Sequence, residues 1–204
     1  MAKGKARILS RAFYMADGLS AASALLGKLL VSQTAEGLTS GRIVEVEAYL
    51  GSGDRAAHAL RGRTPRTEIL WAEGGRAYVY TLHTHHLFNV TLGQAESQDV
   101  VLVRALEPLT GLALMRQRRG ERHPDRLLCA GPGRLCQALG ITRSLYGHDL
   151  TQGAPLCLMD DGTRFPASEI AASPRIGIDY AGPDRDQPWR LTLAKSPFLS
   201  RRRG

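Results

Sequence analysis

GRIVEVEAYLG, residues 41–51, alternates apolar and chemically reactive side chains with the period of two that is typical of a β-strand. One predicted face of this strand carries Val44, Val46, Ala48 and Leu50. The other predicted face carries Ile43, Glu45, Glu47 and Tyr49. Because successive side chains of a strand point to opposite sides of its sheet, we expect one apolar face and one face with carboxylate and phenol groups.

Several other segments have strand-like patterns. Residues 76–82 and 87–92 are rich in β-branched and aromatic side chains and flank the tip His83–His86, which predicts a hairpin. Residues 99–106 predict a further strand, and residues 156–193 contain short strand candidates. Strands outnumber long helices and do not alternate with them, so we expect an α+β fold with a mainly antiparallel sheet.

Fewer segments have the signals of a helix. Ser20 is a suitable N-cap for an apolar helix that runs to about Leu30. A short helix is predicted at 65–71 and longer ones at 108–119 and 131–140, where a proline stands in the first turn and a glycine follows the last.

Length and composition predict one domain. A chain of 204 residues with 43% hydrophobic residues can fold without a metal or a disulfide. We expect a single domain over residues 1–204, with flexible termini at about 1–8 and 201–204. The three cysteines form neither an even set nor a CxxC pair, which argues against a disulfide framework or a thiolate zinc site.

The sequence lacks the features of membrane and secreted proteins. It has no run of about 20 apolar residues and no secretory signal. We therefore expect a cytoplasmic monomer without a membrane partner, associated with the nucleoid if the source is bacterial.

The charge of the chain points to a polyanion. Its formal net charge is +8, and its 27 basic residues are 23 arginines and 4 lysines. Guanidinium groups bind phosphate oxygens bidentately, so this bias favours a nucleic-acid partner. A GC-rich genome is an alternative cause of the arginine excess, although not of the net charge. The arginines cluster at residues 61–66, 116–126 and 201–203.

Two interpretations apply to the acidic face of residues 41–51. Arg104 ends an apolar strand, and a buried guanidinium needs a carboxylate partner. The simpler interpretation is therefore a structural ion pair with Glu45 or Glu47. In the functional interpretation, one carboxylate activates a water molecule that Arg104 and a histidine hold, an arrangement that also suits glycosidic hydrolysis.

The predicted hairpin carries further candidates. Tyr78 and Tyr80 share one face and can either pack in the core or stack on a planar ligand. His83, His85 and His86 suggest a metal site, but residues of one tight turn cannot all reach one ion. We therefore expect no metal and instead assign His83 and His85 to contacts with a nucleic acid.

Ordered motifs along the chain resemble the alkyladenine DNA glycosylase family. They are GRIVEVEAYLG (41–51), AAHA around His58, GRTPR (62–66), AYVY (77–80), RALEPLTG (104–111), GPGRLCQALGI (131–141) and the C-terminal PWR and SPFLSR. The resemblance covers nearly the whole chain, and the order of the blocks makes it specific.

The resemblance implies a monofunctional enzyme that flips damaged purines out of double-stranded DNA and hydrolyses their bond to the sugar in base excision repair. The substrates of such an enzyme would be 3-methyladenine and 7-methylguanine, and also hypoxanthine and ethenoadenine. It also implies a partly barrel-like sheet surrounded by helices, with a hairpin that enters the minor groove. No cofactor is implied.

The same resemblance implies roles for individual residues. Glu47 matches the general base, and His58 and Arg104 match the residues that position the water. Tyr49 and Tyr80 match the aromatic side chains that enclose the flipped base, with the backbone at His58 also in contact with the purine. Asn89 matches the residue that disfavours the amino group of guanine.

The hairpin tip departs from the family pattern. The family usually has a tyrosine there that wedges into the gap left by the flipped nucleotide, whereas this chain has His83 in a hairpin one residue shorter. An imidazole fills less of the gap than a phenol. Two rival functions stay open at this point: a non-catalytic binder of damaged DNA, and a metal-dependent nucleic-acid hydrolase that uses the histidine cluster.

Overall fold

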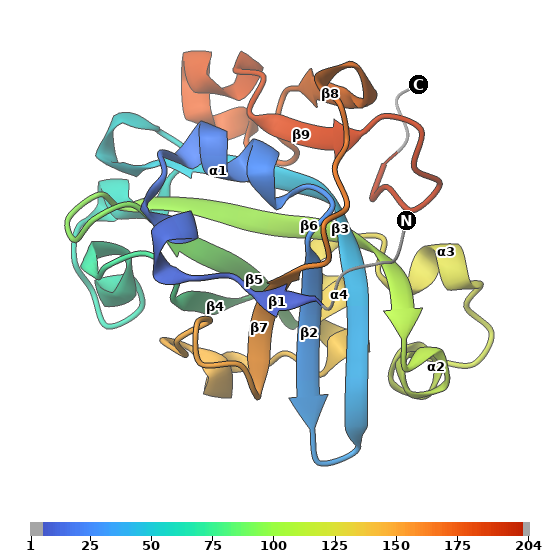
Figure 1. Cartoon of the computed structure of the whole chain (residues 1–204). Helices are drawn as coiled ribbons and strands as arrows, with labels where there is room; N and C mark the ends of the chain where they lie inside the picture. The colour runs from blue at the N-terminus through green and yellow to red at the C-terminus, as the bar shows by residue number, and fades with distance from the viewer. Residues whose placement is uncertain (1–5, 202–204) are drawn as a thin grey trace.

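Strand β3 (Gly37–Leu50) is the longest strand of the sheet and the one on which the others are assembled (Figure 1). In the computed structural model, which describes residues 6–201, it pairs antiparallel with β2, β6 and β9. The sheet has the order β1-β7-β2-β3-β6-β5-β4, and β8 and β9 extend it from β3. The other strands are β1 (Arg7–Ile8), β2 (Leu29–Thr34), β4 (Ala77–Leu82), β5 (His85–Leu92), β6 (Asp99–Thr110), β7 (Leu156–Asp160), β8 (Ile170–Ser173) and β9 (Arg190–Leu193).

Helices pack around this curled, half-barrel sheet, so the expected α+β class with an antiparallel sheet is confirmed (Figure 1). The α-helices are α1 (Gly18–Leu25), α2 (Leu112–Arg119), α3 (Asp125–Leu128) and α4 (Pro132–Leu139). The 3₁₀ helices are η1 (Arg11–Met15), η2 (Gly51–Gly53), η3 (His58–Arg61), η4 (Glu68–Trp71), η5 (Arg143–Leu145), η6 (Ala167–Glu169) and η7 (Asp179–Asp186). Helix α1 packs on β3 and β6, and α4 packs on β5 and β6.

The helix expected over residues 20–30 is wrong at both ends. Helix α1 is capped by Asp17, whose side chain accepts a hydrogen bond from the Ser20 backbone N at 3.0 Å. Gly27 has a left-handed φ of 85°, which interrupts the helical path, and Leu29 begins β2. A short apolar run suits a helix and a buried strand equally well, and here the pairing with β3 and β7 selects the strand.

Strand β6 is longer than the sequence predicts. It continues through Pro108 to Thr110, so Arg104 lies inside the strand rather than at its end, and helix α2 starts only after Gly111. Pro108 pairs with Gly41 beside a register shift. A proline is tolerated in a sheet at such an irregularity because no ladder hydrogen bond is required from its nitrogen.

The hairpin expected from residues 76–92 is formed by β4 and β5. Leu82 pairs with His85, so the turn contains only His83 and Thr84 and is tighter than the predicted tip over residues 83–86. His83 has a φ of 52°. Histidine is one of the few residues other than glycine that adopts this left-handed conformation with some frequency.

The strands β3, β6, β5 and β4 present one apolar face and one reactive face. The apolar face packs in the main core through Val46, Val103, Val90 and Val79. On the opposite face, register pairs form a row across the sheet: Tyr78 with Asn89, Asn89 with Leu102, and Leu102 with Glu47. Alternation along four adjacent strands therefore brings distant segments to one surface.

The predicted alternation in β3 has one exception. Ile43 is fully buried in the core with Val44, instead of sharing the face of Glu45. A register shift between Ile43 and Glu45 explains the exception, because a bulge puts two consecutive side chains on the same side.

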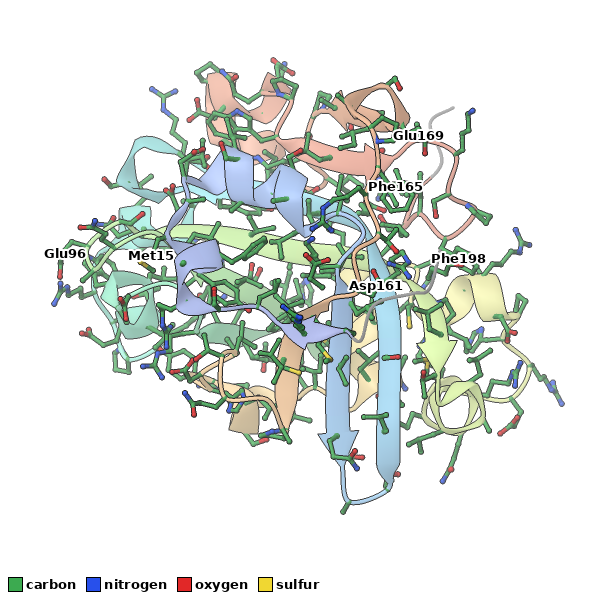
Figure 2. All side chains as sticks on the ribbon, in the orientation of Figure 1. Met15, Glu96, Asp161, Phe165, Glu169 and Phe198 are labelled. Atoms are coloured by element: carbon green, nitrogen blue, oxygen red, sulfur yellow. The ribbon has the colours of Figure 1, made fainter. Side chains whose placement is uncertain are left out.

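Apolar side chains fill the interior between the sheet and the helices, whereas charged groups such as Glu96 point outward at the edge (Figure 2). Cys129, Cys136 and Cys157 are buried and form no disulfide. None of the helices in residues 6–201 is both long and apolar enough to cross a membrane.

The termini expected to be flexible fall largely on residues 1–5 and 202–204, which lie outside the described residues. Within the expected N-terminal segment, Arg7 and Ile8 form β1 and pair with β7.

Candidate active site

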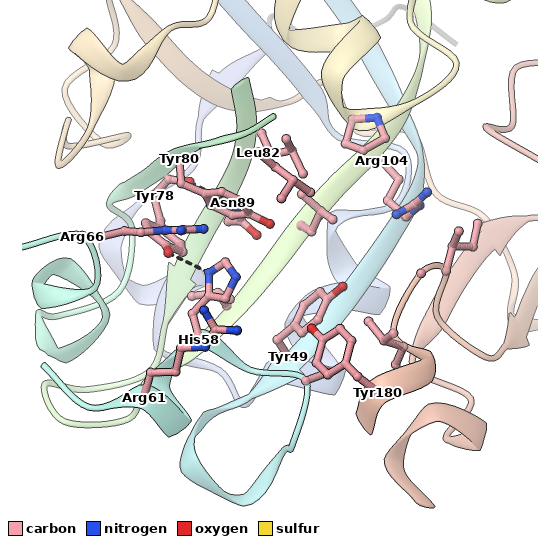
Figure 3. Close-up of a pocket in the computed structure, with 18 of the residues that line it drawn as sticks. Tyr49, His58, Arg61, Arg66, Tyr78, Tyr80, Leu82, Asn89, Arg104 and Tyr180 are labelled. Carbon is pink, nitrogen blue, oxygen red and sulfur yellow. Dashed lines mark hydrogen bonds between the residues drawn. The ribbon is translucent and has the colours of Figure 1, made fainter. Parts of the chain in front are cut away.

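The reactive face of the sheet forms the floor of a cavity of about 490 Å³ (Figure 3). The lining residues used below are Tyr49, His58, Arg61, Arg66, Tyr78, Tyr80, His83, Asn89, Arg104, Ile176 and Tyr180. Tyr49 and Tyr180 stand on one side, and Tyr78, Tyr80 and Arg66 stand on the other (Figure 3). A pocket of this size with aromatic walls and several polar and basic side chains suits a planar ligand that carries polar groups.

Glu47 lies one layer behind the wall of this cavity. It is fully buried, and its side chain is not among the lining residues. Its Oε2 accepts hydrogen bonds from the Tyr49 hydroxyl at 3.0 Å and from Arg104 Nη1 at 3.1 Å, and its Oε1 accepts one from the Ile176 backbone N at 2.7 Å. All three donors line the cavity, so the carboxylate is separated from the cavity by a single layer of hydrogen-bonded groups.

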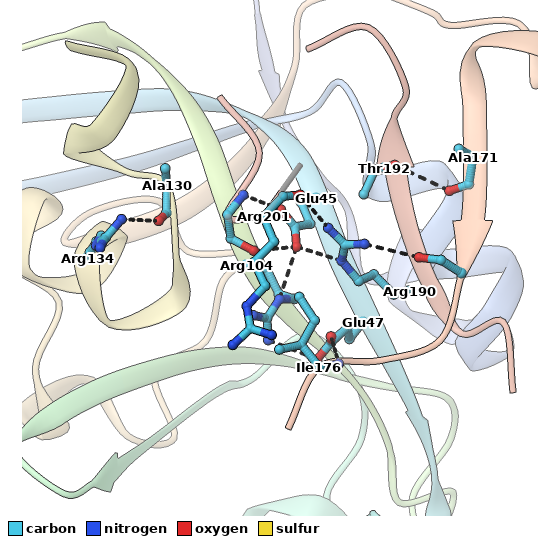
Figure 4. Close-up of polar contacts among 12 residues, drawn as sticks. Glu45, Glu47, Arg104, Ala130, Arg134, Ala171, Ile176, Arg190, Thr192 and Arg201 are labelled. Atoms are coloured by element: carbon cyan, nitrogen blue, oxygen red, sulfur yellow. Dashed lines mark hydrogen bonds and ion pairs between the residues drawn. The ribbon is translucent and has the colours of Figure 1, made fainter. Parts of the chain in front are cut away.

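Arg104 contacts both acidic residues of β3. Its Nε donates to Glu45 Oε1 at 3.1 Å, while its Nη1 contacts Glu47 (Figure 4). Burial opposes the charge on Arg104, but the two carboxylates outweigh this effect and raise its pKa. The structural ion pair predicted from the sequence is therefore present, and it also holds a guanidinium at the wall of the cavity.

A second guanidinium, that of Arg175, packs over the Tyr49 ring. The Arg175 guanidinium carbon lies 4.6 Å from the centre of the Tyr49 ring and 4.8 Å from that of Trp189. The Arg175 side chain is fully buried and forms a bidentate ion pair with Asp54. Burial and the neighbouring Glu47 raise the pKa of Tyr49 well above its usual value, so the phenol keeps its proton and donates a hydrogen bond to the carboxylate.

The opposite wall contains His58, Tyr78 and Tyr80. The His58 Nδ1 lies 2.8 Å from the Tyr78 hydroxyl, and its ring packs edge-on against Tyr80 with the centroids 4.7 Å apart. Asn89 donates from its side-chain amide to the Tyr78 carbonyl at 3.1 Å. His58 therefore contacts the two tyrosines of this wall, and its dashed hydrogen bond to Tyr78 is drawn in Figure 3.

The three histidines of the hairpin have different surroundings. His83 lines the cavity, whereas His85 packs against Gly133 and His86 lies 3.2 Å from the Thr81 hydroxyl through its Nδ1. Within residues 6–201, no group of three or more His, Cys, Asp or Glu side chains is arranged to hold a metal ion. The ligand cluster of the rival hydrolase is therefore not formed.

The arginine clusters differ in whether their guanidinium groups can bind an anion. Arg61 and Arg66 are exposed at the cavity, and Arg66 stacks on the Tyr80 ring at 4.7 Å. Arg116 and Arg118 instead form ion pairs with Asp125 and Glu36 on the protein's own surface. Of these two clusters, the first is better placed to bind phosphates beside the cavity.

Two contributors to the site have no signature in the sequence. Ile176 acts through its backbone N–H, which any residue except proline possesses. Arg175 is an isolated arginine in a loop, and nothing in its local sequence indicates the stack with Tyr49. The sequence does not predict either contribution, because the partners of Arg175 and Ile176 lie more than 120 residues away in the chain.

We predict that His58 is neutral down to unusually low pH. Burial and the nearby Arg66 and Arg61 lower its pKa from 6.5 to about 4. The unfolded chain takes up this proton at higher pH than the folded protein, so stability falls as the pH falls from 6.5 toward 4. The loss is about 3 kcal/mol for this group, to be measured by unfolding of the wild type and His58→Gln across this range. An NMR titration midpoint of His58 near the ordinary value would contradict the prediction.

The comparisons with known proteins agree with this geometry. The family model for methylpurine-DNA glycosylase matches residues 12–197. A Bacillus subtilis (strain 168) relative that bears the name 3-methyladenine DNA glycosylase is 47% identical over 190 residues, covering 93% of this chain and 94% of the relative. A Myxococcus xanthus (strain DK1622) relative of the same name is 41% identical over 194 residues, with coverages of 95% and 93%. The chain therefore belongs to the methylpurine-DNA glycosylase family of DNA-repair enzymes.

Proposed function

We propose that this protein acts as a monomer on cytoplasmic or nucleoid DNA, flips damaged purines into the cavity and hydrolyses their glycosidic bonds. The primary substrate is 3-methyladenine. 7-Methylguanine, which keeps the amino group of guanine, and the neutral bases hypoxanthine and ethenoadenine are excised more slowly. The observation that carries this proposal is one cavity with tyrosines on both sides, Arg104 in its wall and the Glu47 carboxylate directly behind.

The tyrosines of the cavity are suited to bind a flipped base. Tyr49 and Tyr80 provide flat apolar surfaces on the two sides, and base–aromatic stacking contributes about 1–3 kcal/mol per base. Asn89 has its amide fixed on the Tyr78 carbonyl, so its side chain is a rigid obstacle to the additional amino group of guanine. The backbone of His58 provides a further contact for the purine.

Glu47 is suited to act as the general base. Oε2 accepts two hydrogen bonds, from Tyr49 and Arg104, whereas Oε1 accepts one, from the Ile176 N–H, and so keeps the more open acceptor position. A water molecule that enters from the cavity as the nucleotide binds can donate to this position. Glu47 then takes the proton as the water oxygen bonds to the sugar C1′ and the bond to the purine breaks.

The charge of Glu47 also stabilises the reaction. The sugar acquires positive character as the glycosidic bond breaks, and a buried carboxylate favours this state electrostatically. An alkylated purine is already cationic and leaves readily, whereas a neutral base such as hypoxanthine needs a proton or hydrogen bonds as it leaves. No lysine lines the cavity in the described part of the chain, which supports hydrolysis rather than Schiff-base chemistry.

The decisive experiment separates excision from binding and from strand hydrolysis. Methylated DNA is incubated with the protein in a chelator, and the released material is separated by chromatography. We expect free 3-methyladenine, with abasic sites that break only on alkali treatment. In a parallel reaction with divalent cations in place of the chelator, release of nucleotides would support the rival hydrolase. Unchanged DNA under both conditions would support the non-catalytic binder.

The hairpin tip predicts a preference among lesions. The His83 ring is smaller than the family's tyrosine, so it should stabilise the flipped state less, which matters most for well-stacked neutral bases. We expect His83→Tyr to excise hypoxanthine roughly tenfold faster, equivalent to about 1.4 kcal/mol. Release of 3-methyladenine should change little, as measured by single-turnover rates.

His83→Gly is the matched variant, because it relieves the left-handed φ and removes the ring. It should excise hypoxanthine more slowly than the wild type. The hypothesis of a weak wedge fails if His83→Tyr gives no gain on hypoxanthine.

A further inference from the structure

Glu45 is a second buried carboxylate that the proposed reaction does not use. It lies two residues before Glu47, is fully buried and does not line the cavity. Its Oε1 accepts hydrogen bonds from Arg104 Nε at 3.1 Å, Arg190 Nε at 2.8 Å and the Ser200 hydroxyl at 2.6 Å (Figure 4). Its Oε2 accepts one from the Ser200 backbone N at 2.6 Å.

These contacts keep Glu45 ionised. Burial alone would raise its pKa, but the hydrogen bonds from Ser200 and Arg190 and the charge of Arg190 outweigh burial and lower it. Glu47, Arg104, Glu45 and Arg190 thus form a row of alternating charges behind the cavity. These ion pairs hold each guanidinium in one orientation, because each one binds a carboxylate that is itself held in place.

The orientation of Arg104 determines how it meets Glu47. With Nε bound to Glu45, the guanidinium presents only Nη1 to Glu47. Without Glu45, the planar fork would be free to turn and bind both oxygens of Glu47 side by side, which is the preferred geometry of an isolated arginine–carboxylate pair. That arrangement would occupy the acceptor position that the attacking water requires.

We propose that Glu45, anchored by Ser200 of the C-terminal segment, is a positioning residue that keeps Arg104 from closing on both oxygens of Glu47. Ser200, although 155 residues from Glu45 in the chain, thereby acts on Arg104 through Glu45. This inference rests on the proposed role of Glu47 as general base.

The test uses Ser200→Ala in the full chain. The variant keeps the backbone hydrogen bond and loses only the hydroxyl, so the protein should fold with a thermal midpoint a few degrees below that of the wild type. We expect the single-turnover rate of 3-methyladenine release to fall roughly tenfold while the half-saturating DNA concentration stays unchanged. Ser200→Thr should restore most of the rate, because it restores a hydroxyl at the same place.

Ser196→Ala is the matched control. Its hydroxyl belongs to the same segment and accepts from the Phe198 backbone N at 3.2 Å, but it does not contact Glu45. This variant should release the base at the wild-type rate. Glu45→Gln provides a stronger perturbation, with an expected rate loss of about a hundredfold.

A double-mutant cycle distinguishes positioning from general weakening. If Ser200 acts through Arg104 and Glu47, Ser200→Ala should not slow the residual reaction of a Glu47→Gln protein any further. An equal loss in both backgrounds, or a wild-type rate for Ser200→Ala, would overturn the inference. Full activity of Glu47→Gln alone would instead overturn the proposed general base, so the two failures are distinguishable.

Discussion

Glu47→Gln should lower the rate of 3-methyladenine release by about a thousandfold, since loss of a general base typically costs between 10² and 10⁴ in rate. The amide has nearly the shape of the carboxylate but cannot take a proton from water. It also replaces one acceptor oxygen by an NH₂ group, which leaves either the Ile176 N–H alone, or Tyr49 and Arg104 together, without an acceptor. The measurement is a single-turnover rate on methylated DNA, with DNA affinity determined in parallel.

The affinity for lesion-bearing DNA should stay within a few-fold of the wild type, because Glu47 does not line the cavity. Glu169→Gln, on an exposed residue, is the control and should leave both quantities unchanged. A Glu47→Gln protein that releases the base at the wild-type rate would remove Glu47 from the mechanism.

Asp54→Ala should have the largest effect on stability, with a loss of about 3–5 kcal/mol in the free energy of unfolding. Asp54 and Arg175 form an ion pair in which both side chains are fully buried. Removal of the carboxylate leaves a buried guanidinium without its counter-charge and also removes the acceptor of the Ala56 backbone N. For a domain of this size we expect the thermal midpoint to fall by roughly 10 °C, as measured by calorimetry.

The exposed pair of Arg185 and Asp186 supplies the control. These side chains are 58% and 73% exposed, so Asp186→Ala should change stability by less than about 0.5 kcal/mol. Equal stabilities of the two variants would show that the buried pair is not what holds the loop of Arg175 against Tyr49.

The sequence pattern predicts the reactive strand well because its physical basis is local. Alternation with a period of two puts Glu45, Glu47 and Tyr49 on one side, and the same rule puts Tyr78 and Tyr80 together on β4. The pairing of Arg104 with a carboxylate follows from the cost of a buried unpaired charge. Only the three-dimensional structure reveals that Arg104 contacts two carboxylates and that Glu47 lies behind the cavity wall.

Other features depend on contacts between distant segments. The sequence predicts helix where the strand from Leu29 forms, because an apolar run carries no information about its partner strands. The hydrogen bonds of Ser200 and Ile176 to the acidic residues involve backbone groups, which every sequence supplies. The C-terminal segment lies close to β3 because β9 pairs with β3, and neither segment's own sequence predicts this pairing.

The most direct test of the central claim is a crystal structure of the Glu47→Gln protein bound to a duplex that contains one hypoxanthine. We expect the base inside the cavity with Tyr49 and Tyr80 on its two faces, and one ordered water between the sugar C1′ and residue 47. A flipped base that lies outside the cavity, or a C1′ with no water between it and residue 47, would contradict the account.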